Sequence, residues 1–211
     1  MPHDANNDST ARSREALDRS GLVDLFKQSR DRLRRMVGLR LDARLRGRVD
    51  PSDVIQEAYL EATTRHDAYR KNPNMSPFIW LRFLTGQKLC EFHRRHLTVQ
   101  ARDASRDAPM GRNGLPEASS VVLAAELAGQ LTSPSQAAIR AELRARVQQA
   151  IERLDPTDRE ILAMRHFEQL TPAETADVLG LKKSTASMRY LRALERIKPL
   201  LGSVQADADR A

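Results

Sequence analysis

The residues best suited to a chemical role lie close together near the C-terminus, after Gly180. Basic and small polar side chains recur there at the spacing of one helical face. Arginine and lysine can bind phosphates, and short side chains can contact base edges in duplex DNA. We therefore predict a DNA-contacting surface, with a solvated basic face on an ordinary helical hairpin as the alternative. The candidate contacts are Lys182, Lys183, Ser184, Thr185, Met188, Arg189 and Arg192.

A pair of helices joined by a tight turn must position that surface. Thr171 and Pro172 suit an N-cap and a first helical position, and Glu174 completes a capping box. Gly180 supplies the left-handed residue of the turn, and Ser184 is predicted to cap the second helix. This pattern is typical of a helix-turn-helix, whose second helix lies in the major groove. The second helix is expected to bury the stripe Ala186, Tyr190, Ala193, Leu194, Ile197 and Leu201.

A second candidate surface is an acidic stripe on a helix predicted from Pro51 to about Arg65. Asp53, Gln56, Glu57 and Glu61 fall on one face of that helix, and the first three are the candidate docking residues. The chain carries a formal net charge of +7, so an acidic stripe on it has two interpretations. It either keeps the surface soluble or docks on a basic surface of another protein.

Aromatic and basic side chains are interleaved in segment 77–97, which follows a predicted loop at 66–76. Most such aromatics belong to the core, but rings beside cations also suit single-stranded nucleic acid, because bases stack on rings and phosphates bind cations. His93 and His96 are three residues apart, yet no Cys, Asp or third His is placed to complete a metal site. We expect neither metal nor cofactor. The aromatics are Phe78, Trp80, Phe83 and Phe92, and the cations are Arg82, Lys88, Arg94 and Arg95.

Composition narrows the class of protein. Aromatic residues make up only 4% of the 211 residues, and no strand pattern of period two occurs, so the fold is predicted to be all-α. The net charge and a pI near 10.1 favour a polyanionic partner. No apolar run is long enough to span a membrane. The single cysteine, Cys90, excludes an internal disulfide, so we expect a cytoplasmic protein without a membrane partner.

Helix starts define two small helical bundles joined by a long linker. Several starts consist of a capping residue followed by proline, which presets the backbone angle. The bundles are predicted at 21–97 and 133–201, and the second contains the helix-turn-helix. Residues 1–20 are expected to be disordered, 98–132 to be the linker, with a short helix at Val121–Leu131, and 202–211 to be a tail. The proline starts are Asp50-Pro51, Ser76-Pro77, Ser133-Pro134, Asp155-Pro156 and Thr171-Pro172.

The order of these segments resembles a bacterial RNA polymerase sigma factor of the sigma-70 family, in the extracytoplasmic-function (ECF) group. Three segments carry the resemblance: DPSDVIQEAYLEA (50–62), WLRFLTGQKLCEFHRRH (80–96) and LDPTDREILAMRHFEQLTPAETADVLGLKKSTASMRYLRALERI (154–197). The sequences RHFEQLTPAE and SMRYLRAL are similar to variants from planctomycete-type bacteria. Each segment alone is a weak match, and their order and spacing together are specific.

The resemblance implies a transcription initiation factor that binds core RNA polymerase and directs it to promoters. In the bundle at 21–97, similar to sigma region 2, Asp53, Gln56 and Glu57 would dock on the clamp helices of the largest subunit. The same bundle would recognise and melt the minus-10 element. The residues expected on that strand are Arg82, Gln87, Lys88, Arg94 and Arg95.

The resemblance also implies roles for the bundle at 133–201, similar to sigma region 4. Helix 156–167 would bind the flap of the second-largest subunit, and helix 184–197 would contact the minus-35 element. An anti-sigma factor is a further candidate partner. Ser187 joins the minus-35 contacts, although the family often has arginine there, and Met188 replaces a small polar residue. Gly86 and Gln87 replace a common Arg-Asn pair in the melting helix.

Two other classes of function compete with this interpretation. A stand-alone helix-turn-helix regulator that does not bind core polymerase would account for 133–201 but for neither the acidic helix nor the aromatic and basic helix. An enzyme that cuts or joins DNA would need a carboxylate cluster for metal or a nucleophile beside arginines. Tyr59 and Tyr69 have arginine-rich surroundings but no further support. We therefore predict that the protein is not an enzyme.

Overall fold

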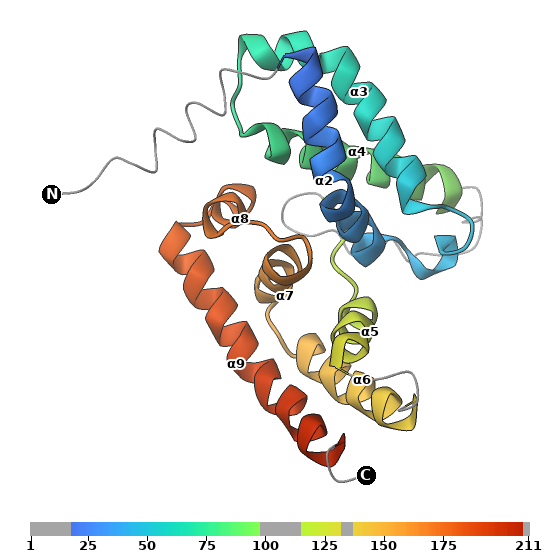
Figure 1. The fold of residues 1–211 in the computed structure, drawn as a ribbon, viewed down its shortest axis with the longest axis vertical. Coiled ribbons are helices and arrows are strands. Elements are labelled where there is room, and N and C mark those ends of the chain that lie inside the picture. The colour runs from blue at the N-terminus through green and yellow to red at the C-terminus, as the bar shows by residue number, and fades with distance from the viewer. Residues whose placement is uncertain (1–17, 98–114, 132–136, 209–211) are drawn as a thin grey trace, which may run out of the picture. The chain divides into compact units, whose positions relative to one another are not determined.

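The computed structural model describes residues 18–97, 115–131 and 137–208 (Figure 1). All regular secondary structure in these ranges is helical, which confirms the all-α prediction. The chain divides into two compact units, Met1–Asp107 and Ala108–Ala211. No helix within the described ranges combines the length and apolar character needed to cross a membrane.

The N-terminal unit consists of α2 (Arg19–Arg40), α3 (Pro51–Lys71) and α4 (Pro77–Leu97), with the short 3-10 turn η1 (Ala43–Leu45) after α2. Each of the three long helices packs against the other two. Apolar side chains spaced at helical intervals fill the space between them. The most deeply buried include Leu33, Met36, Val37, Val54, Ala58, Ala62, Leu81 and Leu89.

Capping side chains set where the first helices begin. The Asp18 carboxylate accepts a hydrogen bond from the Gly21 N–H at 2.7 Å, so α2 begins at Arg19, slightly before the predicted ordered start at residue 21. Asp50 accepts from the Ser52 N–H at 2.7 Å, with Pro51 at the first helical position, as predicted. Residues 1–17 of the predicted disordered segment lie outside the described ranges.

Helix α3 is longer than predicted. The helix was expected to end near Arg65 and a loop to occupy 66–76, but α3 continues to Lys71. Tertiary packing accounts for the difference, because the Tyr69 ring stacks on Trp80 of α4 with centroids 4.2 Å apart. The Tyr69 hydroxyl also donates to the Met75 carbonyl at 2.6 Å. The connection before α4 is therefore shorter than the predicted loop.

The described residues of the C-terminal unit form six helical segments: α5 (Ser120–Leu131), α6 (Ala137–Glu152), α7 (Pro156–Leu162), the π-helical turn η2 (Ala163–Phe167), α8 (Pro172–Leu179) and α9 (Lys183–Ala208). Helix α9 packs against α5, α6, α7 and α8, so it is the central element of this unit. The core side chains include Leu123, Leu143, Val147, Ile151, Ile161, Leu162, Met164, Ala193 and Ile197.

The short helix expected inside the predicted linker is present as α5, which starts one residue earlier than Val121. Its buried side chains Leu123, Ala124 and Ala128 accompany extensive packing of α5 on α6. The buried Glu160 carboxylate of α7 accepts a 2.6 Å hydrogen bond from the Ala118 N–H, just before α5. This end of the 98–132 segment therefore packs as part of the C-terminal unit, and residues 98–114 lie outside the described ranges.

The last helix extends past its predicted end at Leu201. Helix α9 continues through Pro199 and Gly202 to Ala208, so most of the predicted tail 202–211 is helical. The predicted helix start Ser133-Pro134 lies outside the described ranges, and nothing is described of the side chain of Leu201.

Candidate nucleic-acid interface

The first helix of the helix-turn-helix and its turn have the predicted geometry. The Thr171 hydroxyl accepts from the Glu174 N–H at 3.1 Å, and the Glu174 carboxylate accepts from the Thr171 N–H at 2.7 Å, which completes the capping box. Gly180 is left-handed, with φ of 63° and ψ of 34°. After it, the Leu181 N–H donates to the Ala176 carbonyl at 2.9 Å, so the chain is tied back to α8.

The second helix begins earlier than its predicted cap. The Ala186 N–H donates to the Lys182 carbonyl at 3.0 Å, so helical hydrogen bonding starts at Lys182. Ser184, predicted to be the cap, instead lies in the first turn of α9 with its side chain exposed. Its hydroxyl is therefore presented on the helix surface.

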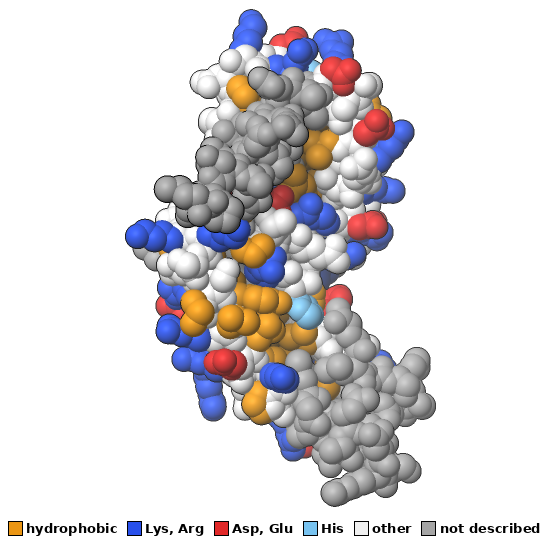
Figure 2. All heavy atoms as spheres, turned by 60° about the vertical axis from the view of Figure 1, so that its left-hand side comes forward, with side chains coloured by type: hydrophobic (Ala, Val, Ile, Leu, Met, Phe, Trp, Pro, Cys, Tyr) orange, Lys and Arg blue, Asp and Glu red, His pale blue; other side chains and the backbone are white. Residues whose placement is uncertain are grey.

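One face of α9 is buried and the opposite face is exposed. Ala186, Ala193 and Ile197 of the predicted stripe are buried, and Tyr190 and Leu194 are half-buried. In Figure 1, α9 lies in the lower half of the view. In the same half of Figure 2, both Lys and Arg side chains and hydrophobic side chains are at the surface. The predicted DNA contacts that are exposed are Lys182, Lys183, Ser184, Thr185, Met188 and Arg192, and Ser187 is half-buried.

Arg189 differs from the other predicted DNA contacts. Its Nε lies 2.5 Å from an Asp158 carboxylate oxygen, and its Nη2 lies 2.7 Å from an Asp155 oxygen. Both acids belong to the N-terminal end of α7, so the guanidinium joins α9 to α7. Arg189 therefore holds two helices of the unit together in this structure and does not stand free on the exposed face.

Leu191 is a large, exposed apolar residue of α9 that was not among the predicted contacts. Leu191 is 51% exposed, like Met188, which lies three residues earlier on the same side of the helix. The exposure of Leu191 could have been predicted from the sequence, because Leu191 falls outside the buried stripe around Ala193 and Ile197. A large apolar residue off that stripe indicates a surface position.

The acidic stripe of the N-terminal unit lies on the surface of α3. Asp53 and Gln56 are exposed, and the Glu57 side chain is 37% exposed. Leu60, one turn further along, is 63% exposed and was not among the predicted docking residues. Leu60 therefore adds an exposed apolar side chain to the acidic stripe.

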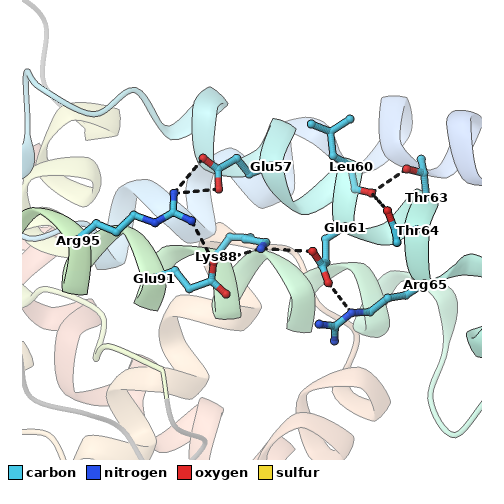
Figure 3. Close-up of polar contacts among 9 residues, drawn as sticks. All are labelled: Glu57, Leu60, Glu61, Thr63, Thr64, Arg65, Lys88, Glu91 and Arg95. Carbon is cyan, nitrogen blue, oxygen red and sulfur yellow. Dashed lines mark hydrogen bonds and ion pairs between the residues drawn. The ribbon is translucent and has the colours of Figure 1, made fainter.

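Carboxylates of α3 are linked to cations of α4, as Figure 3 shows. Glu57 lies 3.4 Å from Arg95, and Glu61 lies 3.4 Å from Lys88. Glu91 of α4 adds contacts of 3.1 Å to Lys88 and 3.5 Å to Arg95. The hydrogen bond from Lys88 lowers the pKa of Glu61, and the bond to Glu91 raises the pKa of Lys88, so both groups are charged at neutral pH.

The predicted minus-10 residues do not share one exposed face. Arg82 is buried, Gln87 and Lys88 are half-buried, and Arg94 and Arg95 are exposed. The aromatics divide in the same way. Phe83 is 46% exposed and so offers a surface for stacking, and the others belong to the core. The buried aromatics of α4 are Phe78, Trp80 and Phe92.

His93 is part of the interior of the N-terminal unit. It is buried, and its Nε2 accepts a hydrogen bond from the Asp42 N–H at 3.3 Å. Burial lowers the pKa of His93, so the ring is neutral near pH 7. Among the described residues, no group of three or more His, Cys, Asp or Glu side chains could hold a metal ion.

Comparisons with known proteins point to one class of protein. Residues 144–197, which include α7, α8 and the exposed face of α9, match the family model described as Sigma-70, region 4. The RNA polymerase sigma-C factor of Myxococcus xanthus is 31% identical over 129 residues, which are 57% of this chain and 41% of that protein. The chain thus spans less than half the length of that relative.

A second relative matches across both units. The ECF RNA polymerase sigma factor SigD of Mycobacterium tuberculosis (strain ATCC 25618 / H37Rv) is 28% identical over 182 residues, 86% of this chain and 77% of that protein. These matches support a sigma factor of the ECF group. They do not bear on the planctomycete-type variant, which stays a prediction.

A solved structure, "Structure of CnrH in complex with the cytosolic domain of CnrY", is similar over 95% of this chain and 99% of that chain. The two chains are 17% identical and superimpose with a TM-score of 0.48, a likeness too low to bear on partners or mechanism.

Proposed function

We propose that the chain is a cytoplasmic, non-enzymatic transcription initiation factor of the ECF sigma group, which binds core RNA polymerase and directs it to specific promoters. The observation that carries the proposal is the exposed basic face of α9 within the segment that matches Sigma-70 region 4. The similarity to SigD over 86% of the chain extends the argument to the N-terminal unit. An anti-sigma factor stays a prediction from the sequence resemblance.

In this proposal α9 lies in the major groove of the minus-35 element. A helix fits that groove, and residues in its N-terminal half approach base edges. Lys182 and Lys183 stand at the start of the helix, where they would bind phosphates and fix its register. Thr185 and Arg192 are exposed on the face that would meet the bases.

The N-terminal unit has two roles in the proposal. Asp53, Gln56 and Glu57 dock on the clamp helices of the largest subunit, and the exposed Leu60 adds apolar contact at that surface. On α4, Phe83 and Arg94 are exposed and suit contact with a melted minus-10 strand. The helix at 156–167, which α7 and η2 form, is assigned to the flap of the second-largest subunit.

The proposal is tested by polymerase capture. The triple variant Asp53→Ala, Gln56→Ala, Glu57→Ala should bind core polymerase at least tenfold more weakly, because it removes the charged part of the docking surface. A matched control is Asp24→Ala with Asp31→Ala, which removes two exposed carboxylates from α2. The triple variant should keep its helicity, since its side chains are on the surface.

The same experiment separates the two main candidate functions. If the wild-type chain never captures core polymerase but binds duplex DNA alone, the stand-alone regulator is the better assignment. If the triple variant binds polymerase as tightly as the control does, the docking role of the acidic stripe is wrong.

A further inference from the structure

Two large apolar side chains stand exposed on the helix proposed to enter DNA. Met188 and Leu191 are each 51% exposed, and their spacing of three residues makes them neighbours on one face of α9. Met188 lies between the exposed Thr185 and Arg192, and Leu191 lies beside Met188 at the edge of the proposed base-contacting face. Neither residue belongs to the buried core, so both apolar side chains are accessible for contact outside the unit.

The charges around this pair specify the kind of partner. Lys182, Lys183, Arg192 and Arg196 are exposed, and none of them forms an ion pair within the described part of the chain. An apolar centre with cations at its margins is complementary to the major groove, whose walls are phosphates and whose floor is base edges. Glu195 is also exposed and lies one turn beyond Leu191, so it borders the apolar pair on the side away from Lys182 and Lys183.

The guanidinium that could otherwise contact bases at this level is engaged elsewhere. Arg189 directly follows Met188, but its guanidinium is bound by Asp155 and Asp158 of α7. Beside Thr185 and Arg192, the large exposed groups at this level of the face are therefore a thioether and an isobutyl side chain. Such groups cannot form hydrogen bonds of the kind that identify guanine or adenine.

We infer that Met188 and Leu191 recognise thymine C5-methyl groups, so that the minus-35 sequence bound by this chain carries thymines at neighbouring positions. Among the four bases, thymine is the one that presents a methyl group in the major groove. The two side chains are about 4.5 Å apart along the helix axis, close to the ~3.4 Å rise of one base pair, so they can meet methyls on adjacent or nearly adjacent pairs. This inference rests on the proposed function.

The test removes the methyl groups alone. Duplexes are selected from a random pool by the full chain, once alone and once bound to core polymerase, and each thymine of the selected sequence is then replaced by uracil. Uracil keeps every hydrogen-bonding group and lacks only the methyl. We expect replacement at two neighbouring positions to weaken binding by about threefold to fivefold each, the effect of one buried carbon group.

Variants of the protein identify which residues sense the methyl. In Met188→Ala with Leu191→Ala, binding should be weaker and should no longer change when thymine is replaced by uracil, because the partner of the methyl has gone. Val121→Ala is the matched control, since Val121 is an exposed apolar residue of the same unit, at 38%, on α5. It should keep both affinity and the response to uracil.

Three outcomes would overturn the inference. If selected duplexes bind equally well with uracil at every position, the methyl groups are not recognised, whereas the proposed function stands as long as polymerase is captured. If the double variant binds DNA normally but loses polymerase, the apolar pair is a protein contact. If no duplex is retained by either preparation, both the inference and the minus-35 role fail together.

Discussion

The predicted DNA-contacting cations of the two units differ in their ion pairing. In the N-terminal unit, Lys88 and Arg95 lie within ion-pairing distance of carboxylates on α3 and α4. In the C-terminal unit, Lys182 and Lys183 are exposed and form no ion pair with the described residues. The sequence presents both groups as candidate DNA contacts, yet only the second presents uncompensated charge to a polyanion.

The difference shows what a cationic residue on a helix can do before any partner arrives. A cation held by carboxylates contributes to helix packing and must exchange partners to bind phosphate, so its net contribution to DNA affinity is reduced. An exposed cation releases counterions from DNA at no such cost. In the proposed roles, Lys182 and Lys183 can bind phosphate directly, whereas Lys88 and Arg95 must first exchange their carboxylate partners.

Arg189 is the exception among the predicted DNA-contacting cations of the C-terminal unit, and its replacement should have the largest effect. Arg189→Ala should lower the free energy of unfolding of this unit by about 1–3 kcal/mol, because two charge-assisted hydrogen bonds to α7 are lost. Denaturation followed by circular dichroism measures this. Fluorescence of the single tryptophan, Trp80, reports the N-terminal unit and should be unchanged. If Arg189→Ala leaves the free energy of unfolding unchanged, the contacts of Arg189 with Asp155 and Asp158 do not stabilise the unit.

Salt dependence should distinguish the two groups of cations directly. Lys182→Ala should reduce the slope of log affinity against log salt concentration by about 0.9 in promoter binding by the polymerase complex. Lys88→Ala should change the slope much less, because Glu61 and Glu91 already neutralise this side chain. Equal changes in slope for the two variants would remove the comparison between the units.

A pH titration tests the interior of the N-terminal unit. Burial lowers the pKa of His93 below its ordinary value of 6.5, so the unfolded chain takes up the proton more readily than the folded chain. Stability from this residue should be fully present above about pH 6.5 and be lost as the pH falls through the lower folded pKa. Asp42 and Arg44, which lie nearby, act in opposite directions on this pKa.

The variant His93→Gln isolates that contribution. Glutamine can accept the Asp42 N–H bond but does not titrate, so the difference in stability between the wild type and the variant should vary with pH only in this window. Trp80 fluorescence during urea unfolding provides the readout. A difference that stays constant from pH 5 to pH 8 would show that His93 does not titrate with folding.

The smallest expected effect concerns Arg95. Glu57→Gln removes one of its carboxylate partners, so the free chain should bind single-stranded DNA up to about threefold more tightly, within the range of an exposed ion pair. Glu142→Gln is the control, because it breaks the exposed Glu142–Arg146 pair of α6. Equal behaviour of the two variants would mean that the pair with Glu57 does not restrain Arg95.

Much of the fold could be predicted because local hydrogen bonding fixes it. Thr171 and Glu174 form the predicted capping box, and Gly180 adopts the predicted left-handed turn. Asp50 and Asp155 cap the helices that begin at the following prolines. These features depend on residues within four positions of one another, so their sequence signals are complete.

The extent of α3 could not be predicted in the same way. Residues 66–71 have no regular apolar period, and their helical state depends on Tyr69 packing on Trp80 of another helix. The prediction of Ser184 as the cap of the last helix was also wrong, because helical hydrogen bonding already starts at Lys182. Both differences lie at helix ends, where tertiary contacts outweigh local preference.

By itself, the sequence determined that the chain is all-helical, where most of its helices begin, and which face of α9 is buried. Caps, proline, glycine and the apolar period act over one or two helical turns, so a linear pattern contains them. Only the tertiary structure decided which charges are available. Arg189 meets Asp158, and Arg95 meets Glu57, across 31 and 38 positions of the chain. Such ion pairs form when separate helices pack, so the spacing of nearby residues in the sequence cannot predict them.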